Sequence, residues 1–442
     1  MSRLALLGGE PVRREPFPAY NFVGGEEIAA VTRVLESGNL SQYLGTWHDD
    51  FYGGPEVRAF ESEWARAFKA KHAVSVNSAT SGLYAAAGAA GVGPGDEVIV
   101  SPYTMMASAT AALVFNAVPV FADIDPQTFC LTADTIRARL TPRTKAIIVV
   151  HIFGGPADMD PIVALARERN LIVIEDCAQI PFGAYRGRPL GTFGHMGVYS
   201  LNYHKHIHTG EGGVVVTNDD RLAERVALIR NHGEAVVGKK GHEDIVNIVG
   251  FNFRLGEMEA AVGRCQLAKG PDLVARRRAL VASLEKKLAG IPGLTPAPVR
   301  RGDTHVYYVH PLLFDAAAAG VSRELFVRAV KAELPPTRLR EQHGVLIGAG
   351  YLRPLYLEPM YQRQIAYGTV SCPFKCPHYK GEADYRPGLC PNAERAHNET
   401  LITHELMRPP MTDRDLDDVA AAFHKVAGNV SALSNFPVKG GI

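Results

Sequence analysis

Short apolar runs alternate with amphipathic stretches along the chain from Lys71 to about Asp219. The apolar runs are rich in Val and Ile, which favours β-strands, and they occupy residues 74–76, 97–100, 118–123, 146–151 and 171–175. The stretches between them, residues 81–90, 107–116, 132–140 and 161–170, have the periodicity of helices. Strands that alternate with helices in this way predict an α/β fold with a mainly parallel sheet and helices on both of its faces.

The remainder of the chain predicts further helices and a second domain. Residues 219–233 favour a helix, a glycine- and lysine-rich loop follows at 238–242, and a strongly helical region runs from Pro271 to about Leu288. A more irregular tail completes the chain. We therefore expect an N-terminal arm over residues 1–40, a large domain over 41–269 and a smaller C-terminal α+β domain over 270–442.

Composition and charge narrow the class of protein. The chain has 442 residues, of which 46% are hydrophobic and 21% charged, so it can bury a large core. Its formal net charge is +1 without any block of like charge, which argues against a nucleic-acid or membrane-surface partner. The first apolar run is too short for a signal peptide, and no apolar stretch is long enough to span a bilayer. Six cysteines in a chain of this length fit reduced thiols, and together these features predict a cytoplasmic globular protein.

One lysine lies in a context that suggests covalent catalysis. Lys205 precedes a Gly-Glu-Gly-Gly turn at residues 210–213, and the turn leads into an apolar β run at 214–217. A lysine amine becomes a catalyst when it condenses with a carbonyl, above all with the aldehyde of pyridoxal phosphate (PLP). Upstream, a buried-strand pattern leads into Asp176, a carboxylate of the kind that pairs with the pyridine nitrogen of this cofactor. We therefore predict a PLP site in which Lys205 forms the Schiff base and transfers the proton, while Asp176 keeps the ring nitrogen protonated.

A phosphate-binding turn is expected where residues 76–83 pass from a strand to a helix. Free backbone N–H groups and the hydroxyls of Thr80 and Ser81 converge at this point, and a helix N-terminus favours a dianion. An ordinary helix N-cap has the same composition, so it is the downstream residues that favour a phosphate here.

Three stretches of the sequence resemble the DegT/StrS family of sugar aminotransferases, which are PLP enzymes of fold type I. These stretches are residues 175–179 (Glu-Asp-Cys-Ala-Gln), 200–213 and 250–255 (Gly-Phe-Asn-Phe-Arg-Leu), and the resemblance extends from about residue 37 to 266 and more loosely to the C-terminus. It implies a seven-stranded sheet, with Ala178 beneath the cofactor ring, Gln179 near the phenolic oxygen and Ser200 at the phosphate. It also implies a homodimer with shared active sites, because the family delivers the residue that matches Asn252 to the phosphate of the neighbouring subunit.

Three further positions are compared with the family pattern. Ala79 stands where glycine is usual, and Met105 stands where an aromatic residue usually covers the other face of the ring, with Tyr103 close by. The polarizable sulfur of a methionine can also cover a ring. His305 resembles a small-domain residue that faces the substrate in the family, although a buried structural histidine fits the sequence equally well.

The tail contains a cluster of sulfur and imidazole groups that raises the question of zinc. The cluster consists of Cys372, Cys376, His378, Cys390 and His397. Its spacing lacks the paired two-residue gaps of common zinc sites, and prolines beside Phe374 favour a rigid loop. We therefore expect no metal.

The expected function is amino transfer in two half-reactions. Glutamate or glutamine gives its amino group to PLP, and the resulting pyridoxamine phosphate aminates a ketone on a sugar or cyclitol, in the biosynthesis of an antibiotic or a surface glycan. Two alternatives remain. The first is a sugar dehydratase of the same family, in which histidine replaces the Schiff-base lysine. His204 and His206 flank Lys205, so an alignment shifted by one residue would place a histidine at this position and favour the dehydratase. The second is a non-catalytic sugar-binding or regulatory protein with a PLP-enzyme fold.

Overall fold

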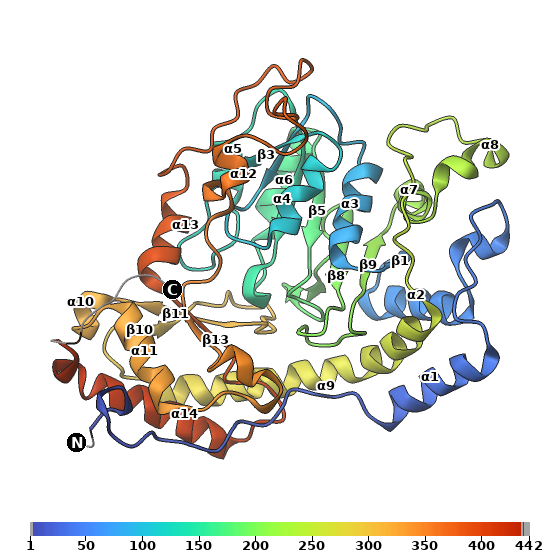
Figure 1. The fold of residues 1–442 in the computed structure, drawn as a ribbon. Coiled ribbons are helices and arrows are strands. Elements are labelled where there is room, and N and C mark those ends of the chain that lie inside the picture. Colours follow the sequence, from blue (N-terminus) through green and yellow to red (C-terminus); the bar gives the residue numbers. More distant parts are fainter. Residues whose placement is uncertain (1–2, 435, 437–442) are drawn as a thin grey trace.

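The computed structural model describes residues 3–434 and 436, and a seven-stranded sheet lies at its centre (Figure 1). In spatial order the strands are β1 (His72–Val76), β9 (Gly213–Thr217), β8 (Met196–Ser200), β5 (Ile172–Asp176), β4 (Thr144–Val150), β2 (Glu97–Val100) and β3 (Val118–Phe121). Neighbours from β8 to β3 run parallel, whereas β9 is antiparallel to both β8 and β1. The predicted α/β fold with a mainly parallel sheet is confirmed. The sequence does not predict β8, because its short Met-Gly-Val-Tyr-Ser run has no distinctive β pattern.

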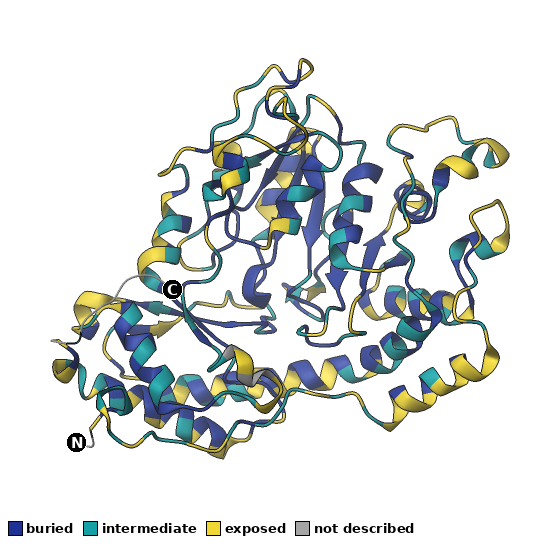
Figure 2. Ribbon diagram, viewed as in Figure 1, coloured by how far each residue is buried: buried dark blue, intermediate teal, exposed yellow. Residues whose placement is uncertain are grey.

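Helices cover the sheet, so that every residue of β2, β8 and β9 is buried (Figure 2). The helices of this part of the chain are α1 (Gly25–Ser37), α2 (Pro55–Phe68), α3 (Ala79–Ala89), α4 (Met106–Leu113), α5 (Ala133–Arg137), α6 (Met159–Glu168), α7 (Asp220–Arg230) and α8 (Val237–Lys240). Helix α3 packs against α4 and α7 and touches β8 and β9, while α2 packs on β1 and α6 on β5. The hairpin of β6 (Ala184–Tyr185) and β7 (Arg188–Pro189) lies apart from the main sheet.

A long helix, α9 (Glu257–Leu288), joins the two halves of the molecule (Figure 1). It contacts α1 and α2, which lie near the start of the sequence, and also α14 (Asp413–Ala427), which lies near its end. The sequence predicts a strongly helical region from Pro271 to about Leu288, and in the structure this region is the second half of one helix that begins at Glu257 and contains Pro271. At Gly270 a Cβ would come within 2.2 Å of the Phe182 ring, so the helix passes directly against that ring. The predicted boundary between residues 269 and 270 falls inside this continuous helix.

A four-stranded antiparallel sheet forms the second half, in the order β10 (Leu294–Pro296), β11 (His310–Phe314), β13 (Leu401–His404) and β12 (Ile347–Ala349). It packs with α10 (Ala316–Ala319), α11 (Arg323–Glu333) and α14. The N-terminal arm shares this core through Leu4 and Phe17, so the arm is bound to the C-terminal half of the chain.

A segment of the tail leaves this half and packs on the large domain. It contains α12 (Pro359–Gln362) and α13 (Pro391–Arg395) and lies beside β3 in Figure 1. The hydroxyl of Tyr379 donates to Glu97 Oε1 at 2.9 Å, and that of Tyr385 donates to the carbonyl of Pro119 at 2.8 Å. Buried residues of the segment 355–396 therefore share one hydrophobic core with the seven-stranded sheet, and the division at residue 270 stays a prediction. No helix in the described part of the chain has the length and apolar character needed to cross a membrane.

Candidate active site

Lys205 lies in the segment between β8 and β9, at a cavity of about 220 Å³. Its backbone N–H donates to the carbonyl of Asn202 at 2.9 Å, which turns the segment inward, and the residue is only 8% exposed. The Lys205 Nζ atom lies 4.2 Å from the centroid of the Tyr308 ring. Burial lowers the pKa of the Lys205 amine to about 8, although the charges of Asp176 and Glu405 act in the opposite direction. At pH 7 about a tenth of this amine would therefore be uncharged, far more than for an ordinary lysine.

Asp176 ends β5 and borders the same cavity. Its Oδ2 atom accepts a hydrogen bond from the Ser108 hydroxyl at 2.7 Å, and its Oδ1 atom accepts one from the Ala178 N–H at 3.1 Å. The Ser108 hydroxyl also lies 3.2 Å from that of Thr104. These contacts hold the carboxylate in one orientation within a buried environment, which is the condition for pairing with a cationic ring nitrogen.

The N-terminus of α3 also borders the cavity. Ser78 is the N-cap residue, and the cavity is lined here by Ser78, Ala79 and Thr80 together with the polar side chains of Ser200 and Asn202. The first N–H groups of a helix have no partner within the helix and favour a dianion. A Cβ on Gly213 would come within 2.7 Å of the Ala79 nitrogen, so glycine allows β9 to approach this turn closely. Ser81 plays a different part: its N–H donates to the Ser78 hydroxyl at 3.0 Å and its hydroxyl to Asn77 at 2.6 Å, outside the cavity lining.

The remaining residues expected around the cofactor ring also border this cavity. Ala178 and Gln179 line it beside Asp176, and Met105, at the N-cap of α4, lines it with 58% of its surface exposed. Gln179 is oriented by two hydrogen bonds, because its carbonyl accepts from the Phe153 N–H at 2.6 Å and its amide donates to the Tyr351 hydroxyl at 3.2 Å. Tyr103 does not line the cavity; it is fully buried and packs edge-on against Phe153 and Tyr351.

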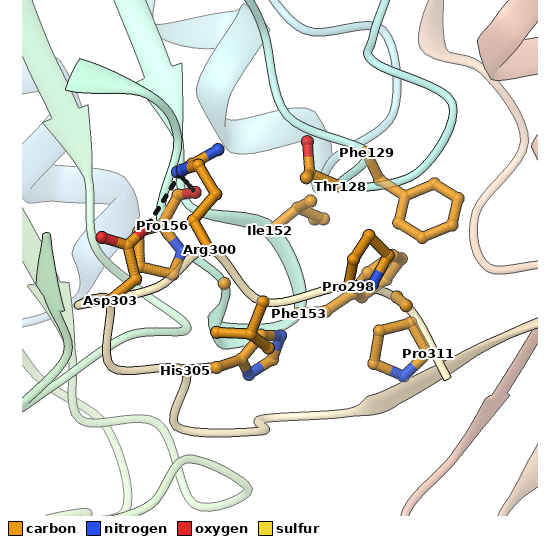
Figure 3. A pocket seen from close by; sticks show the side chains of 13 residues that line it. Thr128, Phe129, Ile152, Phe153, Pro156, Pro298, Arg300, Asp303, His305 and Pro311 are labelled. Carbon is orange, nitrogen blue, oxygen red and sulfur yellow. Dashed lines mark hydrogen bonds and ion pairs between the residues drawn. The ribbon is translucent and has the colours of Figure 1, made fainter. Parts of the chain in front are cut away.

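Besides Ser81, two more expected site residues are not brought to this cavity. Asn252 is exposed, and its side-chain oxygen accepts a hydrogen bond from Arg254 at 2.7 Å. His305 lines a separate pocket, shown in Figure 3, with Phe129, Ile152 and Pro298. Its ring stacks on Tyr307 at 4.0 Å, its Nδ1 atom accepts from the Tyr307 N–H, and burial lowers the pKa of the imidazole to about 3. These contacts favour a buried structural role for His305, which is one of the two alternatives that the sequence leaves open.

The structure also adds residues to the site that the sequence does not identify. Those that line the cavity are Ser78, Leu83, Thr104, Ala107, Val150, Asn202, His204, Glu211, Tyr308 and Tyr351. Ser78, Asn202, His204 and Glu211 lie within or beside the motifs already singled out, so closeness in the sequence could have found them. Tyr308 and Tyr351 come from the C-terminal half of the chain, and no local pattern marks them.

The cysteines of the tail do not assemble a set of metal ligands within the described residues. The group whose ligand atoms lie within 4.8 Å of one another is His151, Glu175 and Cys177, which is buried. Glu175 already accepts hydrogen bonds from the N–H groups of Gly191, Phe193 and Gly194, each at 2.7 Å, and contacts His151 at 3.2 Å. This network fixes the strand end that carries Asp176, and we assign it a structural role.

The residues present fit PLP. A buried amine of low pKa, a carboxylate held by fixed donors and a helix N-terminus with adjacent hydroxyls surround one cavity, which matches an aldehyde, a pyridine nitrogen and a phosphate.

Comparisons with known proteins agree with this geometry. The sequence matches the DegT/DnrJ/EryC1/StrS aminotransferase family over residues 23–376. It is 34% identical over 437 residues to the L-glutamine:2-deoxy-scyllo-inosose aminotransferase of Streptomyces lividus, covering 96% of this chain and 97% of that protein. It is 33% identical over 422 residues to the spore coat polysaccharide biosynthesis protein SpsC of Bacillus subtilis (strain 168), covering 94% and 98%. The solved structure of an aminotransferase from Psychrobacter cryohalolentis matches with a TM-score of 0.79 at 31% identity and covers 94% of this chain and 100% of that one.

Proposed function

Because the chain belongs to the DegT/DnrJ/EryC1/StrS aminotransferase family and is a PLP-dependent aminotransferase, we propose that it moves the amino group of glutamine or glutamate to a ketone of a sugar or cyclitol. The substrates named for the Streptomyces lividus relative support glutamine as donor and a cyclitol as acceptor. The polysaccharide named for the Bacillus subtilis relative supports a saccharide acceptor. On its sequence we place the protein in the cytoplasm.

The observation that carries this proposal is the convergence of Lys205 and Asp176 on one cavity beside the α3 N-terminus. When bound, PLP supplies the aldehyde that receives the amino group and a ring that withdraws electrons from the adjacent carbon. Asp176, fixed by Ser108 and Ala178, holds the proton at the ring nitrogen. Lys205 accepts and returns a proton at Nζ, which a pKa of about 8 permits near neutral pH. Ser78, Thr80 and Ser200 orient the phosphate.

The arrangement around Lys205 favours a transaminase over the two alternatives. The charge of Asp176 acts directly on the Lys205 amine, whereas His206 is buried with its Nε2 atom 2.9 Å from the carbonyl of Val306. His204 also lines the cavity, but Lys205 lines it too. A dehydratase of the family has histidine in place of this lysine, so the presence of Lys205 argues against that alternative. A low-pKa lysine, an oriented carboxylate and a helix N-terminus around one cavity support amino transfer over a non-catalytic role.

The test of this function uses colour and amino transfer together. The purified protein should be yellow, and borohydride should bleach it and attach the mass of the cofactor to the peptide that contains Lys205. Addition of L-glutamine followed by a keto-cyclitol should yield the aminocyclitol, detected by mass spectrometry. A dehydratase would carry no label on Lys205, and a non-catalytic protein would be labelled but would transfer no amino group; either result contradicts the proposal.

We further propose that the enzyme is a homodimer in which Asn252 of each chain serves the phosphate of its partner. Large apolar side chains are exposed on α1 and in the segment before Asn252: Ile28, Leu35, Ile245, Val246 and Val249 are each at least 55% exposed. Such exposure is typical of surfaces that another chain covers. Asn252 is itself exposed and lies outside the cavity of its own chain, which suits a residue that acts across a two-fold interface.

Mixing two inactive variants should restore part of the activity. With Asn252→Ala and Lys205→Ala chains exchanged in equal amounts, about half of the dimers are mixed, and each has one site with both residues intact. We expect about a quarter of the parent activity in this mixture, measured as transfer from L-glutamine. If Asn252 served its own chain, every site would carry a defect, and the mixture would show no gain over the separate variants. A Lys286→Ala chain, altered at an exposed position on α9, replaces the Asn252→Ala chain in the control.

A further inference from the structure

A second cavity of about 220 Å³ lies at the opposite edge of the central sheet from Lys205. It borders Glu97, the first residue of β2, whereas Asp176 is the last residue of β5, which runs in the same direction. Its walls are the segment 138–143, between α5 and β4, and the tail segment 382–385. The two cavities have the same volume and share no lining residue within the described part of the chain. The second cavity therefore has room for a small organic molecule of its own.

The two walls of this cavity carry opposite charges. Arg139 lies on one wall, and Glu382 and Asp384 lie on the other. Arg139 forms no ion pair within the described residues, and its buried Nε atom finds no hydrogen-bond partner there. Asp384 has one long contact, in which its Oδ2 atom lies 3.6 Å from Nη2 of the exposed Arg386. A buried guanidinium donor is costly to leave unpaired, so an unpaired cation that faces carboxylates indicates a ligand with charges of both signs.

The other two charged residues of the lining, Arg143 and Glu97, pair with each other. The Nε atom of Arg143 donates to Glu97 Oε1 at 3.0 Å, and the Tyr379 hydroxyl donates to the same oxygen at 2.9 Å. The remaining lining is mainly apolar and includes Pro119, Val120, Leu140 and Ala383. A lining of this kind with a few charged groups is typical of a site for a small molecule that has an apolar part.

We infer that this cavity binds a free α-amino acid with an uncharged, apolar side chain. Its α-carboxylate lies against Arg139, its α-ammonium group against Glu382 and Asp384, and its side chain against the apolar part of the lining. A sugar or cyclitol has no charge to match either wall, and two carboxylates would repel a phosphate or a nucleotide. The inference does not depend on the proposed function, because the Lys205 cavity is a separate site.

Calorimetry with L-leucine and two matched analogues tests the inference. 4-Methylpentanoate is leucine without its ammonium group, and 3-methylbutan-1-amine is leucine without its carboxylate. The parent should bind leucine, and it should bind each analogue at least about tenfold more weakly, because each analogue loses one charge-assisted contact. Leucine should still bind after borohydride has attached PLP to Lys205, which distinguishes this cavity from the active site.

Variants on both walls assign the contacts. Arg139→Gln should weaken leucine binding by about 10- to 100-fold, and Arg139→Lys, which keeps the charge, should weaken it less. Glu382→Gln combined with Asp384→Asn should weaken the binding of leucine more than that of 4-methylpentanoate, which has no ammonium group to lose. Arg137→Gln makes the same change as Arg139→Gln at an arginine that is 52% exposed and outside the lining, so it should match the parent.

Hydrogen exchange locates the bound leucine. It should protect the backbone amides of residues 138–143 and 382–385 in the parent and leave those of Arg139→Gln unchanged. No binding to the parent, equal binding of leucine and either analogue, or loss of binding after borohydride treatment would overturn the inference. Parental binding in a folded Arg139→Gln protein would overturn it as well. Thermal unfolding verifies that each variant is folded, and the double variant on the carboxylate wall decides the question if Arg139→Gln is not.

Discussion

Lys205→Ala should abolish amino transfer while leaving the fold intact. The variant loses the amine that PLP engages and the group that moves the proton, and the loss of positioned proton transfer alone costs about 10²- to 10⁴-fold in rate. The fold should persist because the Lys205 amine is buried, and burial disfavours its charged form. Replacing it with the small apolar side chain of alanine removes no charge on which the fold depends. The measurement is the rate of transfer from L-glutamine after PLP is added to the purified variant.

Two controls make this result specific to the position. Lys286→Ala removes an exposed lysine from α9 and should retain the activity and colour of the parent. A thermal unfolding midpoint of Lys205→Ala close to that of the parent would show that the loss is chemical. Turnover near the parent rate in a folded Lys205→Ala protein would refute the assignment of this lysine.

Asp176→Asn should still bind PLP but turn over several orders of magnitude more slowly. An amide cannot hold the ring nitrogen protonated, so the negative charge that develops on the substrate carbon loses its stabilisation. The variant should also shift the pKa of the Lys205 amine below about 8, since the Asp176 charge raises it. A single-turnover measurement of the glutamine half-reaction reports the rate, and its pH profile reports the second effect.

The neighbours of Asp176 provide graded controls. Ser108→Ala removes one hydrogen bond to the carboxylate without removing the charge, so its loss of rate should be much smaller. Asp134→Asn makes the same chemical change at a side chain that is 93% exposed and should have no effect. A loss of less than about tenfold in Asp176→Asn, about 1.4 kcal/mol of barrier, would mean that another group pairs with the ring nitrogen.

Much of the large domain follows from local patterns. Apolar runs in β2, β4 and β5 match the predicted strands to within a few residues, because strands buried on both faces need continuous apolar side chains. The helices α3, α4 and α6 are likewise found close to the predicted positions. The family, its fold and its PLP chemistry were also evident from the motifs around Asp176 and Lys205. Here the residues that carry the chemistry lie within short segments at strand ends, so adjacency in the sequence already implies adjacency in space.

The long helix and the tail were harder to predict. Proline is disfavoured inside a helix, yet α9 continues through Pro271. Packing of α9 against α1, α2 and α14 outweighs the loss of one backbone N–H donor. Residues 355–396 follow the small domain in the sequence but pack on β2 and β3, where Tyr379 and Tyr385 find hydrogen-bond partners more than 260 residues away. Hydrophobicity marks these tyrosines as buried and says nothing about which surface they cover.

For this protein, the sequence alone determined most strands and helices around the seven-stranded sheet, because they depend on backbone periodicity. It also marked Lys205 and Asp176 as the candidates for the Schiff base and the ring nitrogen, because each lies in a motif of residues a few positions apart. Only the tertiary structure decided that Tyr308 and Tyr351 complete the cavity, that His305 lies in another pocket, and that Tyr20, Arg277 and Arg408 meet beside Lys205. The physical reason is that these side chains come from the arm, α9 and the tail, and their meeting depends on how separate elements pack. No local pattern records such contacts, since each of these residues would look ordinary in its own segment.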